Sequence, residues 1–243
     1  MAFIAQLREL SGGKPIGLKL CVGHRYEFLA IVKAMLEKNI TPDFIVIDGK
    51  EGGTGAAPLE LTNHVGLPLM DGLIFVRDAL IAAGLRDRVK IGASGKLITA
   101  YDICRTLALG ADYVMCARGF MFSLGCIQAR ACHTNHCPTG VTTQEWYRQR
   151  ALVVSDKAQR VANFHKNTLR AIGDVIGAAG LTHPGELRPW HLHLRRQSGA
   201  VLRGEEAYPL PKPGSLLDDG AEGFMAREWK RAQTGSFHPL TDY

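Results

Sequence analysis

Residues 43–58 read DFIVIDGKEGGTGAAP, a short apolar run followed at once by a glycine-rich loop. The run is rich in β-branched and aromatic residues and has no alternating polar side chains, which predicts a strand buried on both faces, as in a parallel sheet. In the loop, the adjacent glycines and a third at position 55 let the backbone approach a planar or anionic ligand closely. An ordinary turn has the same composition and remains the alternative.

The same order of strand, loop and helix recurs on both sides of this stretch. Short apolar runs predict strands over residues 15–20, 43–48, 89–94 and 113–118. Apolar residues with a helical period predict helices over residues 3–10, 25–38, 71–83 and 99–109. Strands that alternate with helices through short connections predict a parallel sheet with helices outside. A (β/α)8 barrel needs twice as many strands, so the sequence is expected to form its C-terminal half.

Small residues follow the third and fourth predicted strands, in IGASGKL (91–97) and CARGF (116–120). Backbone N–H groups of such loops, the first of which leads into a helix N-terminus, can bind a phosphate. In barrels the phosphate site often lies after strands 7 and 8, which agrees with a C-terminal half. The chain has neither a P-loop nor a dinucleotide fingerprint, which favours a ligand with one terminal phosphate. Two ordinary turns remain the alternative.

A polar loop with three cysteines follows, GCIQARACHTNHCPTG over residues 125–140. The spacing of Cys126, Cys132 and Cys137 is too irregular for one helix face, so it indicates a loop that wraps a small centre. Thiolates hold iron–sulfur clusters, and a Cys-Pro ending is common among these sites. Three ligands rather than four indicate the 3Fe–4S type.

Two other interpretations of the cysteine loop stay open at this point. Zinc could use the cysteines together with His133 or His136, although the usual short Cys-Cys spacing is missing. A disulfide with one spare thiol is the other alternative. The remaining cysteines, which lie on apolar stretches, are predicted to be buried and inert; they are Cys21, Cys104 and Cys116.

Lys19 lies inside the otherwise apolar run GLKL. Lysine is almost never fully buried without a partner. Its side chain is therefore expected either to lie at the polar end of the strand or to direct a cation into the site, where it would stabilise negative charge.

Residues 1–143 are predicted to form the partial barrel with its cysteine loop. A helical extension over 144–190 follows, with a long amphipathic helix from Ser155 to Gly180. Residues 191–243 are rich in proline, glycine and charge, which predicts a flexible tail.

The composition limits the class of protein. Its 243 residues are 46% hydrophobic and 21% charged, which is ordinary for a soluble globular protein. No apolar run approaches the ~20 residues of a membrane span, and no signal peptide opens the chain. Six cysteines without a signal predict a reducing, cytoplasmic setting. The net charge of +6 comes without a nucleic-acid-binding module, so it predicts a solvated basic surface or a patch for an acidic redox partner.

Taken together, four segments resemble the FMN-binding domain of the glutamate synthase family. They are GLKL (17–20), IDGKEGGTGAAP (47–58), GASGKL (92–97) and GCIQARACHTNHCPTGVTTQ (125–144). The resemblance covers residues 10–180 and is most specific in the cysteine run. It implies a (β/α)8 barrel that binds FMN at its C-terminal face beside a 3Fe–4S cluster. The implied reaction reduces 2-iminoglutarate, formed from 2-oxoglutarate and ammonia, to L-glutamate.

The resemblance also implies roles for individual residues. The cluster ligands would be Cys126, Cys132 and Cys137. Lys19 would lie against the flavin as the catalytic candidate. The other cofactor-binding candidates are Gly52, Gly53, Ser94, Gly95, Arg118 and Gly119. The implied partners are an electron donor, either ferredoxin or an NADPH-dependent flavoprotein subunit, and ammonia that is free or derived from glutamine.

The sequence also departs from the family pattern. An acidic residue and paired glycines of the phosphate loop are replaced by Ser94, Gly95 and Lys96. No counterpart of the first barrel strands or of the glutaminase domain is found, so a C-terminal portion of the small, single-domain branch is expected. An N-methylglutamate synthase-type subunit and a non-catalytic cluster-binding remnant are the alternative functions.

Overall fold

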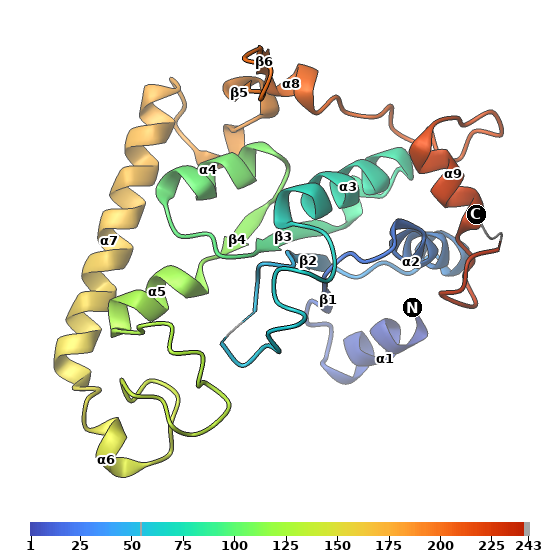
Figure 1. The fold of residues 1–243 in the computed structure, drawn as a ribbon. Coiled ribbons are helices and arrows are strands. Elements are labelled where there is room, and N and C mark those ends of the chain that lie inside the picture. The colour runs from blue at the N-terminus through green and yellow to red at the C-terminus, as the bar shows by residue number, and fades with distance from the viewer. Residues whose placement is uncertain (54, 241–243) are drawn as a thin grey trace.

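The computed structural model describes residues 1–53 and 55–240. Its main sheet has four parallel strands in chain order (Figure 1). They are β1 (Gly17–Leu20), β2 (Phe44–Asp48), β3 (Lys90–Ser94) and β4 (Tyr113–Met115). All four predicted strands are confirmed, but β4 ends before residue 118 because a helix begins at Ala117.

Helices alternate with these strands. They are α1 (Ala2–Leu10), α2 (Arg25–Lys38), α3 (Leu69–Ala82), α4 (Ala100–Ala108) and α5 (Ala117–Leu124). The parallel sheet with its outer helices is the expected half of a (β/α)8 barrel. Within the described residues, β1 and β4 each have a strand neighbour on one side only.

The core lies between the sheet and its helices. Ile45, Ile47 and Ile91 are fully buried and pack with apolar side chains of α2 and α3, such as Leu29 and Leu73. Because side chains alternate along a strand, the next residues point to the other face of the sheet. That face is partly open, since the side chain of Lys19 is half exposed.

Two aspartates make equivalent contacts at the end of the sheet where the parallel strands begin. Asp43 Oδ2 accepts hydrogen bonds from the Ile16 N–H at 2.7 Å and from Arg8 at 2.9 Å. Asp112 Oδ2 accepts from the Ile91 N–H at 2.7 Å and from Arg86 at 2.9 Å. The Arg8 hydrogen bond lowers the pKa of Asp43. The stabilisation from this contact is therefore present above the ordinary aspartate pKa and is lost as the pH falls through the lowered value.

Replacing Asp112 by alanine is expected to lower the free energy of unfolding by about 2–3 kcal/mol. The variant loses the charge-assisted bond to Arg86 and leaves the Ile91 N–H without its acceptor. Urea unfolding measures the change. Asp87→Ala, at an exposed site in the short turn that carries Arg86, is the control and should change stability by less than about 0.5 kcal/mol. Equal effects of the two substitutions would show that the Asp112 contacts do not stabilise the sheet.

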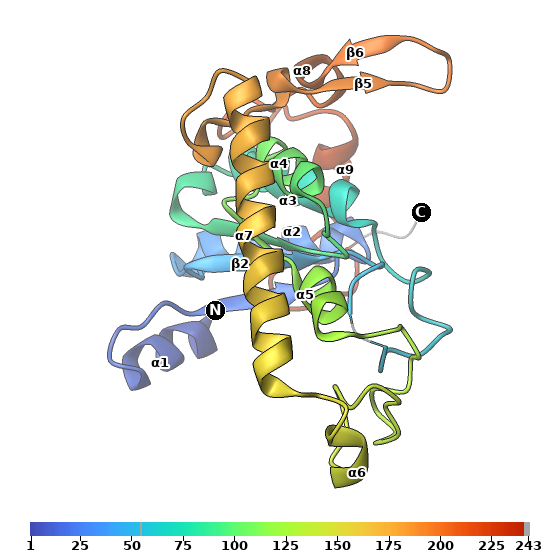
Figure 2. The same cartoon turned by 90° about the vertical axis from the view of Figure 1, so that its left-hand side faces the viewer.

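The chain then continues into α6 (Trp146–Gln149) and the long α7 (Val154–Ala178). The predicted helix from Ser155 to Gly180 is thus confirmed to within two residues. Figure 2 shows α7 crossing in front of α4 and α5, with α6 at one end of the molecule. Within the described part of the chain, every helix is too short or too polar to cross a bilayer.

The residues after 191 differ from the predicted flexible tail. They form a β5 (His193–Arg195) and β6 (Val201–Arg203) hairpin, then α8 (Gly204–Ala207) and α9 (Phe224–Arg231). Leu216, Ala226 and Ala232 are buried in the core. Lys33 of α2 donates to the Ala232 carbonyl at 2.8 Å. A few well-spaced apolar residues are enough to hold this polar segment against α2 and α3, which its mean composition does not reveal.

Candidate functional site

A cavity of about 330 Å³ opens at the carboxyl ends of β2, β3 and β4. Four separate loops contribute to it, as expected for the active face of a parallel α/β sheet. Its walls are formed by Gly52, Gly53, Gly55, Ala56, Ser94, Lys96, Met115, Ala117, Arg118, Met121, Cys126, Cys132 and Thr142. The structure therefore brings together most of the residues that the sequence singled out. Met115, Met121 and Thr142 were not predicted.

The glycine-rich loop after β2 packs tightly against its own strand. A side chain at Gly52 would collide with the Asp48 carboxylate, and Gly53 has a left-handed φ of +78°. Glu51 in the same loop accepts a hydrogen bond from the Leu69 N–H at 2.9 Å, which caps the first turn of α3. The loop is thus folded back onto the site, and its glycines are required by geometry.

The loop after β3 places different residues than expected toward the cavity. Ser94 and Lys96 line it, and Lys96 Nζ donates to Asn63 at 3.0 Å. Gly95 does not line it, because a Cβ there would point at Leu69, 3.1 Å from its Cβ. The backbone φ at Gly95 is +154°, a value that residues with a side chain rarely adopt. Backbone geometry therefore explains why this residue is a glycine. Gly95 therefore shapes the turn of the loop, and a larger side chain there would meet Leu69 rather than enter the cavity.

The candidate phosphate site lies at α5 rather than at the helix after β3. The N-terminus of α4 is already satisfied, because Thr99 and Asp102 form a reciprocal capping box. The helix α5 has no side-chain cap, so its first N–H groups have no acceptor from a cap residue. Arg118 in its first turn lines the cavity and donates to the Gly53 carbonyl at 3.4 Å. A cation and a helix N-terminus together favour an anion here.

Gly119 serves packing in this structure. It is buried in α5, and a Cβ at this position would lie 2.6 Å from the Phe164 ring of α7. Phe164 is itself held edge-to-face by Phe120 at 5.1 Å between ring centroids. The sequence could not reveal this role, because the partner lies 45 residues further along the chain (164 minus 119).

Gly119→Ala is expected to destabilise the protein by about 1–3 kcal/mol, because the added methyl group forces α5 and α7 apart. Gly173→Ala in α7 is the matched control, since no atom lies within 4 Å of the place that its added methyl group would take. The control should stabilise the protein by about 0.5–1 kcal/mol through helix propensity. Thermal unfolding of both variants checks the pair, and destabilisation by both would contradict the packing role of Gly119.

The three predicted ligand cysteines border one small cavity of about 30 Å³. Cys126 and Cys132 also line the larger cavity, so the two spaces adjoin. The loop that carries them winds tightly, with left-handed φ angles at Gln128, Arg130 and Asn135. All six cysteines are free, which excludes the disulfide alternative in this structure. Cys104 is buried as predicted, but the prediction is wrong for Cys21, which is exposed, and Cys116 is half-buried.

Cys137 is the most enclosed of the three, at 9% exposure. Burial raises the pKa of its thiol, but hydrogen bonds from Thr139 and Thr142 outweigh burial and lower the pKa to about 6. The thiolate that a metal requires is therefore the favoured form at neutral pH. The two threonines follow Cys137 closely in the sequence, so their hydroxyls were a signal that could have been noticed.

The sulfur atoms do not converge as a ligand set. Across residues 1–53 and 55–240, no group of three or more His, Cys, Asp or Glu side chains is close enough to hold a metal ion. The type of donor suits an iron–sulfur cluster, because three cysteines line one small cavity and the thiol of Cys137 favours the thiolate form. Binding would require the loop to draw the three sulfur atoms together.

Lys19 lies beside the site rather than in the wall of the cavity. Its Nζ forms an ion pair with Asp48 Oδ2 at 2.8 Å, at the carboxyl end of β2. Asp48 pairs in register with Ser94, which does line the cavity. The ammonium group is thus held at the rim of the same face of the sheet, half exposed.

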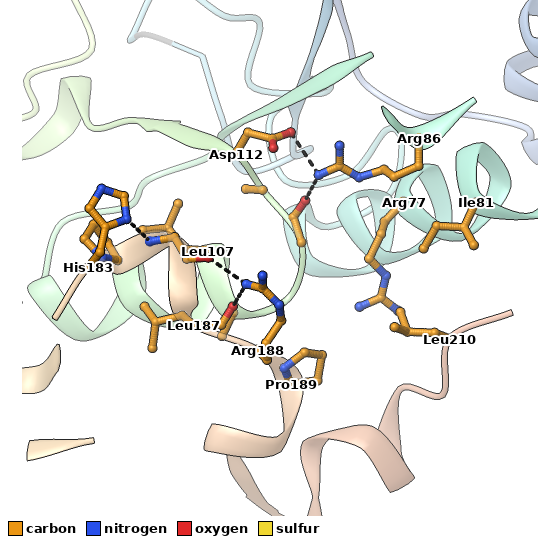
Figure 3. A pocket seen from close by; sticks show the side chains of 15 residues that line it. Arg77, Ile81, Arg86, Leu107, Asp112, His183, Leu187, Arg188, Pro189 and Leu210 are labelled. Carbon is orange, nitrogen blue, oxygen red and sulfur yellow. Dashed lines mark hydrogen bonds and ion pairs between the residues drawn. The ribbon is translucent and has the colours of Figure 1, made fainter. Parts of the chain in front are cut away.

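A second cavity, of about 340 Å³, lies at the opposite edge of the sheet (Figure 3). Three arginines line it, and each of them donates a hydrogen bond to at least one backbone carbonyl. Arg77 donates to the Leu109 carbonyl, Arg86 to the Gly110 carbonyl and Asp112, and Arg188 to the Gly185 and Leu187 carbonyls. These contacts satisfy carbonyls at the end of α4 and in the following segments, so we interpret this cavity as structural.

Comparisons with known proteins point to one family. The family model described as "Conserved region in glutamate synthase" matches residues 1–182. The glutamate synthase large subunit-like protein YerD of Bacillus subtilis is 45% identical over 200 residues, 82% of this chain. An archaeal glutamate synthase [NADPH] of Methanocaldococcus jannaschii is 35% identical over 175 residues, 72% of this chain.

The chain spans only 38% and 34% of the length of these two relatives. Among solved structures, a flavocytochrome b2 variant with sulfite bound is similar at a TM-score of 0.43 and 18% identity. That likeness covers 90% of this chain and 44% of the other, and it is too weak to add to the argument. On the family match and the two relatives, the chain belongs to the glutamate synthase family.

Proposed function

We propose that this chain forms the FMN-binding and iron–sulfur-binding part of an oxidoreductase that reduces 2-iminoglutarate to L-glutamate. One observation carries the proposal: the glycine loop, Arg118 and two of the three cysteines line a single cavity. A flavin site and a cluster site that share walls allow electrons to pass between them over a short distance.

The residues of the larger cavity fit FMN. Arg118 and the uncapped N-terminus of α5 would bind its phosphate, and Lys96 adds a second cation. Gly52 and Gly53 line the cavity with backbone alone, which the flat ring system could approach closely. When bound, FMN supplies the hydride for reduction of the imine carbon. Lys19, positioned by Asp48, would stabilise negative charge on the ring.

The cysteine loop would supply the electrons. Cys126, Cys132 and Cys137 would hold a 3Fe–4S cluster, which accepts electrons from ferredoxin or from an NADPH-dependent flavoprotein. The substrates of the whole enzyme would be 2-oxoglutarate and ammonia, the ammonia being free or derived from glutamine. The balance is simple: 2-iminoglutarate takes up two electrons and two protons to give glutamate.

Glutamate formation tests the proposal. The chain is co-expressed with the N-terminal part of the B. subtilis relative, and 2-oxoglutarate, labelled ammonium and reduced methyl viologen are added. Labelled glutamate is expected. Lys19→Met should lower the rate at least about tenfold, whereas Lys14→Met, at an exposed position before β1, should not. A flavin-loaded preparation that makes no glutamate, or an equal effect of the two substitutions, would contradict the proposal.

A further inference from the structure

Two large aromatic side chains are exposed next to the cysteine loop. Trp146 and Tyr147 of α6 are 70% and 53% exposed, and Val153 and Val154 beside them are exposed as well. The Arg150 guanidinium lies 5.7 Å from the centre of the Trp146 ring. We call these five residues the aromatic–basic patch. Figures 1 and 2 show α6 at one end of the molecule, below the loop between α5 and α6.

The patch is firmly connected to the cysteine loop. The Gln144 N–H donates to Asn135 Oδ1 at 2.6 Å, two residues before Cys137. The Glu145 carboxylate lies 3.3 Å from His136 Nδ1 and forms an ion pair with Arg148. These contacts tie α6 to the segment that carries the candidate cluster ligands, so a protein seated on the patch would lie close to those thiols.

The charge of this region is positive. Residues 126–160 contain five Lys or Arg residues and two Asp or Glu residues, a difference of +3. Both acidic residues are already paired, Glu145 with Arg148 and Asp156 with Lys157 at 3.4 Å. Within the described residues, no carboxylate lies within ion-pair distance of Arg130, Arg150 or Arg160. The field over the patch therefore attracts an acidic surface.

We propose that the aromatic–basic patch is the docking surface for a small acidic electron-carrier protein, a proposal that rests on the proposed function. Exposed Trp, Tyr and Arg side chains are the residues that most often dominate protein interfaces, and opposite charge steers the encounter. A second copy of this chain fits less well, because two basic surfaces would face each other. Two successive one-electron transfers from the carrier supply the two electrons that reduction of one imine consumes, and the two protons come from solvent.

Binding of a plant-type ferredoxin tests the surface directly. The test variant is Trp146→Ala with Arg150→Glu, which leaves the Glu145 contacts in place. The matched control is Trp190→Ala with Arg196→Glu, the same change at exposed positions beside β5, at the far end of the molecule. At low salt, calorimetric titration should show at least about tenfold weaker binding for the patch variant and less than about twofold change for the control. Binding to the unchanged chain should weaken with salt.

Unchanged affinity in the patch variant, or an equal loss in the control, would overturn the docking surface. Self-association of the chain that the patch variant abolishes would assign the patch to a second copy and would also overturn it. Iron content separates this proposal from the proposed function. A chain without iron contradicts the proposed function. If the chain contains iron but the patch substitutions leave its ferredoxin affinity unchanged, only the docking surface is contradicted. Circular dichroism of both variants confirms that they are folded.

Discussion

Replacing Arg118 by glutamate is expected to weaken FMN binding about 100-fold. Arg118 is a charged side chain in the wall of the larger cavity, and it lies in the first turn of α5. The variant removes a charge-assisted bond to the phosphate and places a carboxylate against it, at a cost of about 3 kcal/mol. Each 1.4 kcal/mol corresponds to a factor of ten in affinity, which gives the expected loss.

Quenching of flavin fluorescence on titration with FMN measures this effect. Lys90→Glu is the matched control, because it makes the same two-unit change of charge at the opposite end of β3, where the side chain is 66% exposed. The control should bind FMN as the unchanged chain does. If the Arg118 variant bound FMN as tightly as the unchanged chain does, the phosphate would not bind at α5, and the cavity would have no assigned ligand.

The second large effect concerns the two open edges of the sheet. Within the described residues, β1 and β4 each pair with another strand on one side only. On the face of the sheet away from α2 and α3, the side chain of Lys19 is 50% exposed and Met115 is 41% exposed. Open strand edges and uncovered inner faces are unfavourable in soluble proteins. Relatives are much longer than this chain, so they have further segments that can cover these surfaces.

Co-expression with the N-terminal part of the B. subtilis relative should therefore raise the unfolding temperature by about 10 °C. The physical reason is the apolar surface that the added strands and helices would bury. FMN affinity should rise in parallel, because more loops would surround the ring. An unrelated soluble domain serves as the control partner. An isolated chain that unfolds cooperatively as a monomer, with no gain from the added part, would contradict this account of the edges.

The sequence predicted the order of the elements well, because each strand and helix carries its own periodicity. The four strands, the long α7 and the position of the cysteine loop follow from local patterns of apolar residues. The same holds for the glycine loop, since Gly52 and Gly53 do line the cavity.

Features that depend on distant contacts could not be predicted in this way. A side chain at Gly119 would collide with Phe164 of α7, and a side chain at Gly95 would meet Leu69. The capping box at Thr99 is a local pattern, but only the folded chain shows that it already satisfies the helix end expected to bind phosphate. The tail after residue 191 packs through a few buried side chains, which average composition hides.

Metal analysis of the chain purified without oxygen tests the central claim most directly. All three candidate ligands lie in one loop of this chain, so the chain as purified carries every proposed ligand. The account predicts about three iron atoms per chain and little zinc. Cys132→Ser should lose the iron, and the control Cys21→Ser, at an exposed cysteine, should keep it. Zinc in place of iron, or full iron content in Cys132→Ser, would contradict the account.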